Sequence, residues 1–239
     1  LDEVQAQRRL TIIRVVGICL LSIFVNASYA LARPSIESLF TEAYGAKMYP
    51  RAWLVVAVGV TITVILYNKL VASRPLSVTF ATTAAIATAL LALVYTLRRL
   101  DVPGATFALY IWKEIYIVVL LEGLWTLANS VFRTSAARWV YGLFCVMGSI
   151  AATLGGLALT PISEHWGTET VPLLVMPCIV LAGVTPLVMA RFGADAERPQ
   201  KMKTDFAAGF RVVFQSRYLY LMLILILVVQ VVITLIDYE

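Results

Sequence analysis

Charged and amide side chains inside an apolar stretch are the residues of this sequence best suited to chemistry. The stretch from Tyr110 to Gly156 begins with a segment apolar enough to cross a bilayer, yet that segment carries Lys113, Glu114 and Glu122. A charge near the middle of a membrane costs at least a few kcal/mol, so such residues usually face a polar cavity and a partner. This segment is therefore the first candidate for a binding site.

Helical spacing places the polar residues of this segment along one side of a helix. Steps of three or four residues connect the members of this α-helical stripe, which are Glu114, Val118, Glu122, Trp125 and Asn129. Lys113 falls on another side because it directly precedes Glu114. We expect the three polar members of the stripe to point into a central polar cavity, near groups of the first apolar segment such as Asn26 and Arg33.

Two interpretations of these residues stay open. In the first, they line the path of a small anionic substrate; the candidate substrate-binding residues are Asn26, Arg33, Lys113, Glu114, Glu122 and Asn129. In the second, Lys113 and Glu114 neutralise their neighbours, and Glu122 pairs with another helix to fix the packing.

Composition places the chain among membrane proteins. Hydrophobic residues make up 61% of the chain and charged residues only 14%, whereas soluble domains have about a quarter charged residues. Several apolar runs approach or exceed the ~20 residues that span the hydrocarbon core of a bilayer. The net charge of +5 comes from loops on one side, so no nucleic-acid partner is expected.

The residues that usually serve enzymes and metal sites do not form a recognisable pattern. Cys19, Cys145 and Cys178 fall inside apolar segments without metal-ligand spacing, and the single histidine, His165, lies in a loop. We therefore predict neither a catalytic activity nor a bound metal or cofactor.

The apolar runs predict seven membrane-spanning helices. Their approximate ranges are 10–32, 51–66, 77–97, 106–132, 139–160, 171–192 and 218–236. Residues 33–50 are expected to form a connection, because Pro34 and Pro50 interrupt helical hydrogen bonding. In the fifth span, Gly148, Ala152 and Gly156 stand four residues apart and predict close packing against another helix.

The distribution of lysine and arginine predicts the orientation. With a cytoplasmic N-terminus, the inside segments hold 12 of these residues and the outside segments hold 5. Basic residues are concentrated in cytoplasmic loops. We therefore expect the N-terminus to be cytoplasmic, in a multi-pass protein of a bacterial inner membrane.

Six spans, a polar linker and a seventh span match one half of a major-facilitator-type transporter and the first helix of its second half. The expected class is an all-α polytopic membrane protein with a six-span bundle over residues 1–192. A cytoplasmic linker with a short amphipathic piece at 206–214 would occupy 193–216, and the seventh span 217–239. The rest of the C-terminal half would lie beyond this sequence, and spans one to three and four to six would be inverted repeats.

The central stretch resembles the nucleotide transporter family of plastids, obligate intracellular bacteria and their free-living relatives. That family has a glutamate in an aromatic-rich span, then Trp-x-x-Ala-Asn, an Ala-Arg or Ala-Lys pair, and Tyr-x-Leu-Phe before a glycine-rich helix. The corresponding residues here are Tyr110, Glu114, Trp125, Ala128, Asn129, Ala137, Arg138, Tyr141, Leu143, Phe144 and Gly156. Tyr67-Asn68-Lys69-Leu70 is similar to the family's Tyr-x-Lys-Leu at the end of the second span, and Tyr44-Gly45-Ala46 with Pro50 to its Gly-Ala-Glu…Pro connection.

The resemblance implies exchange or uptake of nucleotides, commonly ATP against ADP, by a major-facilitator-like protein. It implies that Glu114 and Arg33 contact the substrate, while Ile36 stands where the family has a basic residue. Phosphates need paired positive charge in a low-dielectric site. The Ile36 position therefore favours an alternative, in which the chain is a transporter-derived scaffold, sensor or subunit of a larger membrane assembly.

Overall fold

The computed structural model describes residues 2–132, 134–194, 211–212 and 214–238, with the side chains of 2–4, 72–73, 134–138, 230 and 233–238 left aside. The described residues are almost entirely α-helical and include no strand. The chain divides into two compact units, Leu1–Arg198 and Pro199–Glu239. The expected amphipathic piece at 206–214 falls largely outside the described residues.

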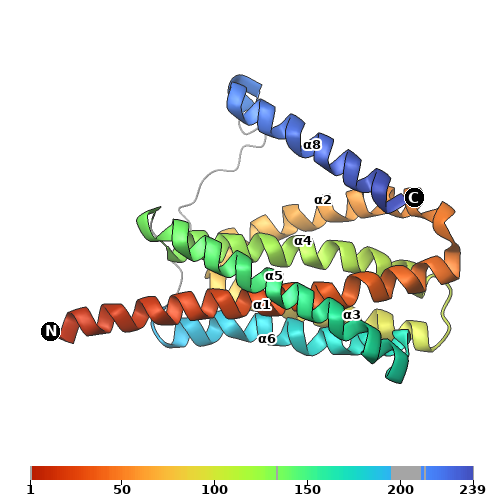
Figure 1. Cartoon of the computed structure of the whole chain (residues 1–239), viewed down its shortest axis with the longest axis horizontal. Helices are drawn as coiled ribbons and strands as arrows, with labels where there is room; N and C mark the ends of the chain where they lie inside the picture. The colour runs from red at the N-terminus through yellow and green to blue at the C-terminus, as the bar shows by residue number, and fades with distance from the viewer. Residues whose placement is uncertain (1, 133, 195–210, 213, 239) are drawn as a thin grey trace. The chain divides into compact units, whose positions relative to one another are not determined.

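The first unit is a bundle of antiparallel helices (Figure 1). Its described α-helices are α1 (Asp2–Tyr44), α2 (Tyr49–Ser73), α3 (Leu76–Arg99), α4 (Ala105–Val131), α5 (Thr134–Trp166) and α6 (Val171–Arg191). Two short 3₁₀ helices lie in the connections, η1 (Ala46–Met48) and η2 (Thr168–Thr170). In the second unit, α8 spans Arg217–Tyr238.

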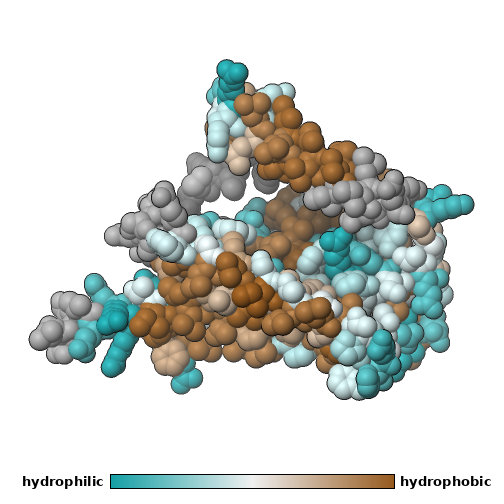
Figure 2. All heavy atoms as spheres, viewed as in Figure 1, coloured by the Kyte–Doolittle hydropathy of each residue, from teal (hydrophilic) through white to brown (hydrophobic). Residues whose placement is uncertain are grey.

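Among the described residues, five helices are long and apolar enough to cross a membrane. They cover Gln5–Tyr44, Ala46–Val71, Leu76–Arg99, Trp139–Trp166 and Thr168–Arg191. Figure 2 shows hydrophobic surface over the middle of the helices and hydrophilic residues towards their ends. This distribution supports the expected class, an all-α membrane protein.

The first helix is longer than the sequence pattern predicts. The expected connection at 33–50 is wrong, because α1 continues through Pro34 to Tyr44. Proline removes one backbone donor from a helix, and Pro34 leaves the carbonyl oxygen of Ala30 without its usual i+4 donor. Side-chain hydrogen bonds and packing against neighbouring helices can keep such a turn helical. Here the buried Ser35 hydroxyl donates to the carbonyl oxygens of Leu31 and Ala32, at 2.7 and 3.1 Å. Pro50 instead stands in the first turn of α2, where a missing donor has no cost.

The helix neighbours follow a repeating pattern. α1 packs against α5 and α6, and α4 packs against α2 and α3. Two further contacts, α1 with α4 and α3 with α6, complete the bundle. If the labels α1, α2 and α3 are swapped with α4, α5 and α6, in that order, the same set of helix–helix contacts results. Because consecutive helices alternate in direction, α1 and α4 run in opposite senses (Figure 1). An inverted repeat has these two properties.

Glycines allow close approach at most of these interfaces. A Cβ atom added at these glycines would come within 3.0 Å of the neighbouring helix: Gly17 (α1·α6), Gly59 (α2·α4), Gly123 (α3·α4), Gly148 and Gly155 (α5·α1), and Gly183 (α6·α3). Small residues at such contacts let helices pack tightly where no hydrophobic effect drives association. The expected small-residue stripe on α5 is therefore partly right, but Gly155 makes the contact that was assigned to Gly156, which faces open space. The contact of α1 with α4 is built differently, by polar and aromatic side chains.

Candidate functional site

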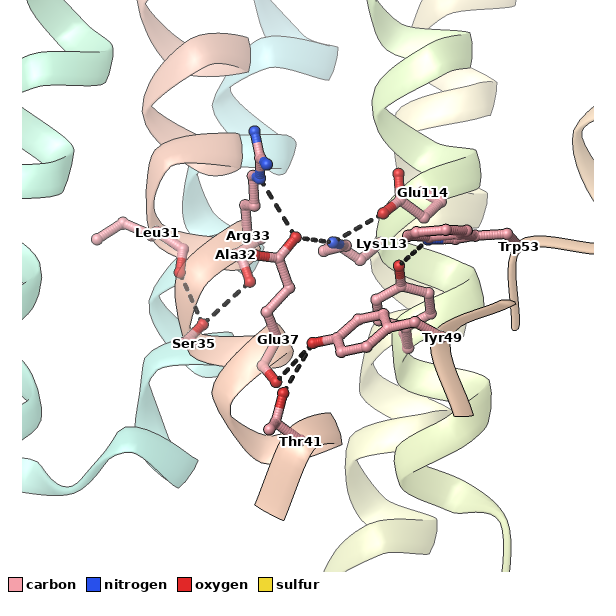
Figure 3. A network of polar contacts seen from close by, with 11 residues as sticks. Leu31, Ala32, Arg33, Ser35, Glu37, Thr41, Tyr49, Trp53, Lys113 and Glu114 are labelled. Carbon is pink, nitrogen blue, oxygen red and sulfur yellow. Dashed lines mark hydrogen bonds and ion pairs between the residues drawn. The ribbon is translucent and has the colours of Figure 1, made fainter. Parts of the chain in front are cut away.

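The candidate site is a network of four charged side chains between α1 and α4 (Figure 3). Lys113 on α4 lies at its centre, with its Nζ 2.7 Å from Oε1 of Glu37 on α1 and 2.8 Å from Oε1 of Glu114 on α4. Arg33 on α1 contacts the same oxygen of Glu37 through its Nε, at 3.2 Å. The network therefore holds two positive and two negative charges, and one carboxylate oxygen joins both cations.

Burial differs sharply among the four side chains. The side chain of Lys113 is fully buried, whereas those of Glu37 and Glu114 are 32% and 27% exposed and that of Arg33 is 41% exposed. A buried ammonium group requires close partners because its desolvation costs several kcal/mol. Lys113 has two carboxylates and also lies over the ring of Tyr110, 4.6 Å from its centroid. The lysine is thus fully compensated, and the other three groups are the ones that solvent can reach.

The continuation of α1 past Pro34 creates this network. Arg33 and Glu37 are separated by one helical turn and can pair only because that turn is helical. Glu37 was not among the predicted site residues, because residues 33–50 were expected to form a connection and a helical pairing of Glu37 with Arg33 was therefore not considered. The signal that could have found it was the i, i+4 spacing of opposite charges at Arg33 and Glu37.

Aromatic side chains pack around the inner side of the network. Phe40 lies 4.5 Å from the ring of Tyr110 by centroid distance, and Tyr49 lies 5.5 Å from the same ring. Trp53 on α2 donates its indole N–H to the Tyr110 hydroxyl at 3.1 Å. Since Tyr110 also supports Lys113, these contacts from α1 and α2 fix the position of the lysine.

The stripe on α4 is the less buried face of that helix. Glu114 and Leu121 are half-buried, and Val118, Glu122, Trp125 and Asn129 are exposed. Glu114 belongs to the network, while Asn129 accepts a hydrogen bond from the Tyr141 hydroxyl on α5 at 2.6 Å. Within the described part of the chain, Glu122 makes no ion pair, and it lies close enough to Tyr67 of α2 for electrostatic interaction.

The structure therefore brings together three of the six predicted site residues, namely Arg33, Lys113 and Glu114. Asn26 belongs elsewhere, because its amide nitrogen donates to the carbonyl oxygen of Ser22 at 2.8 Å, at the contact of α1 with Gly148 of α5. The whole stripe was expected to meet the first span near Asn26 and Arg33; Glu114 is connected to α1 only through Lys113, which contacts Glu37. Lys113 was expected on a different face from Glu114; its long side chain nevertheless reaches back to that carboxylate.

Ile36 is fully buried in the core of the bundle. A basic side chain at this position of α1 would have to leave the aqueous phase completely. The cation that this turn of α1 presents to solvent is instead Arg33.

A second charged cluster lies where α3 ends and η2 begins. Arg98 contacts Oε1 of Glu169 at 3.0 Å, and Arg99 contacts Oε2 at 3.6 Å. These residues line a cleft of about 470 Å³ together with Tyr44, Asp101 and Thr106. Their charged groups are partly exposed, so these pairs are worth about 0–1 kcal/mol each and hold two connections together.

The described residues include no group of three or more His, Cys, Asp or Glu side chains arranged to hold a metal ion. No family model, no curated protein and no solved structure matches the chain. What the sequence and structure define is a class: an all-α protein with several helices suited to a membrane, and a charged network that joins one of them, α1, to the more charged helix α4.

Proposed function

We propose that the chain is part of a secondary active transporter of a small phosphorylated anion, with nucleotides such as ATP and ADP as the favoured substrates. The observation that carries this proposal is the charged network of Arg33, Glu37, Lys113 and Glu114. It places a reachable arginine beside a buried lysine in helices that lie within a membrane protein. Intramembrane ionisable groups of this kind mark substrate and ion pathways.

The arrangement of helices supports the same proposal. In a major-facilitator-like half, two inverted three-helix repeats pack around the first helix of each repeat, and the substrate lies near the repeat interface. The helices α1–α3 and α4–α6 make equivalent contacts, as two such repeats would, and the charged network joins the first helix of each group, α1 and α4. In this proposal the less buried face of α4 faces a second six-helix half of the same protein, in a bacterial inner membrane with the N-terminus in the cytoplasm.

Uptake of labelled ATP, ADP and inorganic phosphate into proteoliposomes that contain the full-length protein tests the proposal. Saturable uptake of at least one of them is expected, and Arg33→Gln should reduce it strongly, because the guanidinium is the most exposed cation of the network. Arg99→Gln is the matched control, since it removes a paired, exposed arginine outside the network. Absence of uptake of all three labelled compounds would refute the proposal.

One observation favours a second candidate function, a transporter-derived scaffold or sensor that does not transport. The network is charge-balanced without a substrate, and Ile36 leaves this turn of α1 with a single cation. Under this alternative the ion pairs only hold α1 against α4. Replacement of Arg33 would then lower the stability of the protein and change no flux.

A further inference from the structure

The charged network has no spare positive charge for an incoming anion. Arg33 and Lys113 share Oε1 of Glu37, and Lys113 also contacts Glu114. An anion that binds here must take a cation away from a carboxylate. The inference drawn from this displacement rests on the transport function proposed above.

Burial decides which cation an anion reaches. The side chain of Arg33 is 41% exposed, whereas that of Lys113 is fully buried beneath Tyr110 and both glutamates. A phosphoryl group accepts from a guanidinium in the same geometry as a carboxylate and carries more negative charge. It therefore competes with Glu37 for Arg33 and leaves Lys113 in place.

Removal of Arg33 from Glu37 unbalances what remains. One ammonium group then faces two carboxylates, and the bound phosphoryl group lies nearby. In a low-dielectric environment this excess of negative charge is unfavourable, and two interacting carboxylates relieve it by taking up a proton together. The other titratable groups that face the pair are Tyr110 and Tyr116 on α4 and Tyr49 on α2, whose phenols bring no positive charge.

We propose that the site binds a phosphorylated anion and a proton together, with Glu37 and Glu114 as the shared proton acceptor beside Lys113. The proton comes from the aqueous phase and protonates one carboxylate of the pair. Lys113 keeps the other carboxylate as its partner, so the buried ammonium group remains compensated. Transport of the anion is then coupled to movement of one proton in the same direction.

The affinity of the purified full-length protein for labelled ATP, measured across a range of pH, tests this proposal. Wherever the empty pair carries no proton and the occupied pair holds one, this linked proton makes the dissociation constant rise about tenfold per pH unit. Glu114→Gln and Glu37→Gln each make one member of the pair permanently neutral and should abolish this slope. Glu164→Gln is the matched control, because this exposed glutamate of α5 is outside the network and should keep the slope.

The same variants in proteoliposomes with an internal pH indicator give the second measurement. ATP uptake by the unaltered protein should acidify the interior and should be stimulated several-fold by an acidic exterior, and the network variants should lose both effects. ATP binding by the unaltered protein with no pH slope and no proton movement overturns the inference while leaving transport standing. Failure to bind or take up ATP and inorganic phosphate overturns the proposed function itself. Since the unaltered protein alone decides between these outcomes, poor folding of a variant does not leave the inference untested.

Discussion

Lys113 of α4 and Glu37 of α1 form an ion pair of 2.7 Å across the contact between these two helices. α1 and α4 are the first helices of the two groups α1–α3 and α4–α6, which make equivalent contacts in the bundle. The other principal contacts use a glycine for close approach, whereas this one uses an ion pair and aromatic rings. Close packing of small residues is hard to undo, but an ion pair can be exchanged for another partner. A site that must rearrange when it binds a charged ligand is better placed at such a contact.

Replacement of Lys113 should destabilise the bundle. Lys113→Ala leaves Glu114 without a cation and Glu37 with Arg33 alone, and because both carboxylates are about a third exposed we expect a loss of about 1–3 kcal/mol. Thermal unfolding in detergent measures the effect. The triple variant Lys113→Met, Glu37→Gln, Glu114→Gln should recover most of the loss, because it removes three charges together and leaves only Arg33, whose side chain is 41% exposed. If the triple variant is less stable than Lys113→Ala, the ion pairs contribute net stability and this account of the network is wrong.

A methyl group at Gly183 should disturb the contact of α3 with α6. The added Cβ would lie 2.8 Å from the Cβ of Ala84, which is attached to the backbone and cannot rotate away. Gly183→Ala should therefore cost about 1–3 kcal/mol of stability in the same unfolding assay. Gly156→Ala on α5 is the matched control, because nothing lies within 4 Å of the added atom; it should have no destabilising effect. Equal effects of the two changes would contradict the interface.

The positions of the helices could be predicted from the sequence because long apolar runs have few alternatives in a membrane. The error at Pro34 shows where that reasoning stops. A proline predicts the loss of one hydrogen bond, but whether the helix ends there depends on how the rest of the turn is held, and here the Ser35 hydroxyl bonds two carbonyl oxygens of that turn. Because the helix was expected to end at residue 32, the pairing of Arg33 with Glu37 one helical turn later was not predicted.

The contact partners of the site residues were harder to predict than the side of the helix on which each residue lies. Helical spacing correctly placed Glu114, Glu122 and Asn129 on one side of α4. It could not show that Asn129 pairs with Tyr141 of α5, since that neighbour is set by how two helices pack. For the same reason the sequence suggested Gly156 where Gly155 makes the contact, because a shift of one residue on a helix rotates the side chain by about 100°.

Replacement of Pro34 should make α1 more stable. Pro34 is exposed and sits inside a helix, so Pro34→Ala restores a backbone donor and removes little packing; we expect a gain of about 1–2 kcal/mol in the free energy of unfolding. Pro50→Ala is the control, since Pro50 lies in the first turn of α2, where its ring costs nothing. That change should be neutral or slightly destabilising. A loss of stability in Pro34→Ala would indicate that the bundle depends on the proline.

Cysteine labelling can show which end of the bundle faces the cytoplasm. Lysine and arginine are concentrated in the segments on the side of the N-terminus, so the turn after α2 should be cytoplasmic and the end of α5 should be outside. In a variant whose Cys19, Cys145 and Cys178 are replaced by alanine, a single cysteine can be placed at Glu164 or at Arg74, both of which are exposed. A membrane-impermeant maleimide added to intact cells should label the cysteine at 164 and leave the one at 74 unlabelled until the membrane is opened. This outcome would also place Arg98, Arg99 and their cleft on the outer side, because they contact Glu169 in the connection that follows α5. Labelling of position 74 alone in intact cells would reverse the orientation, and the anion and proton proposed to enter together would then approach Arg33 from the cytoplasm.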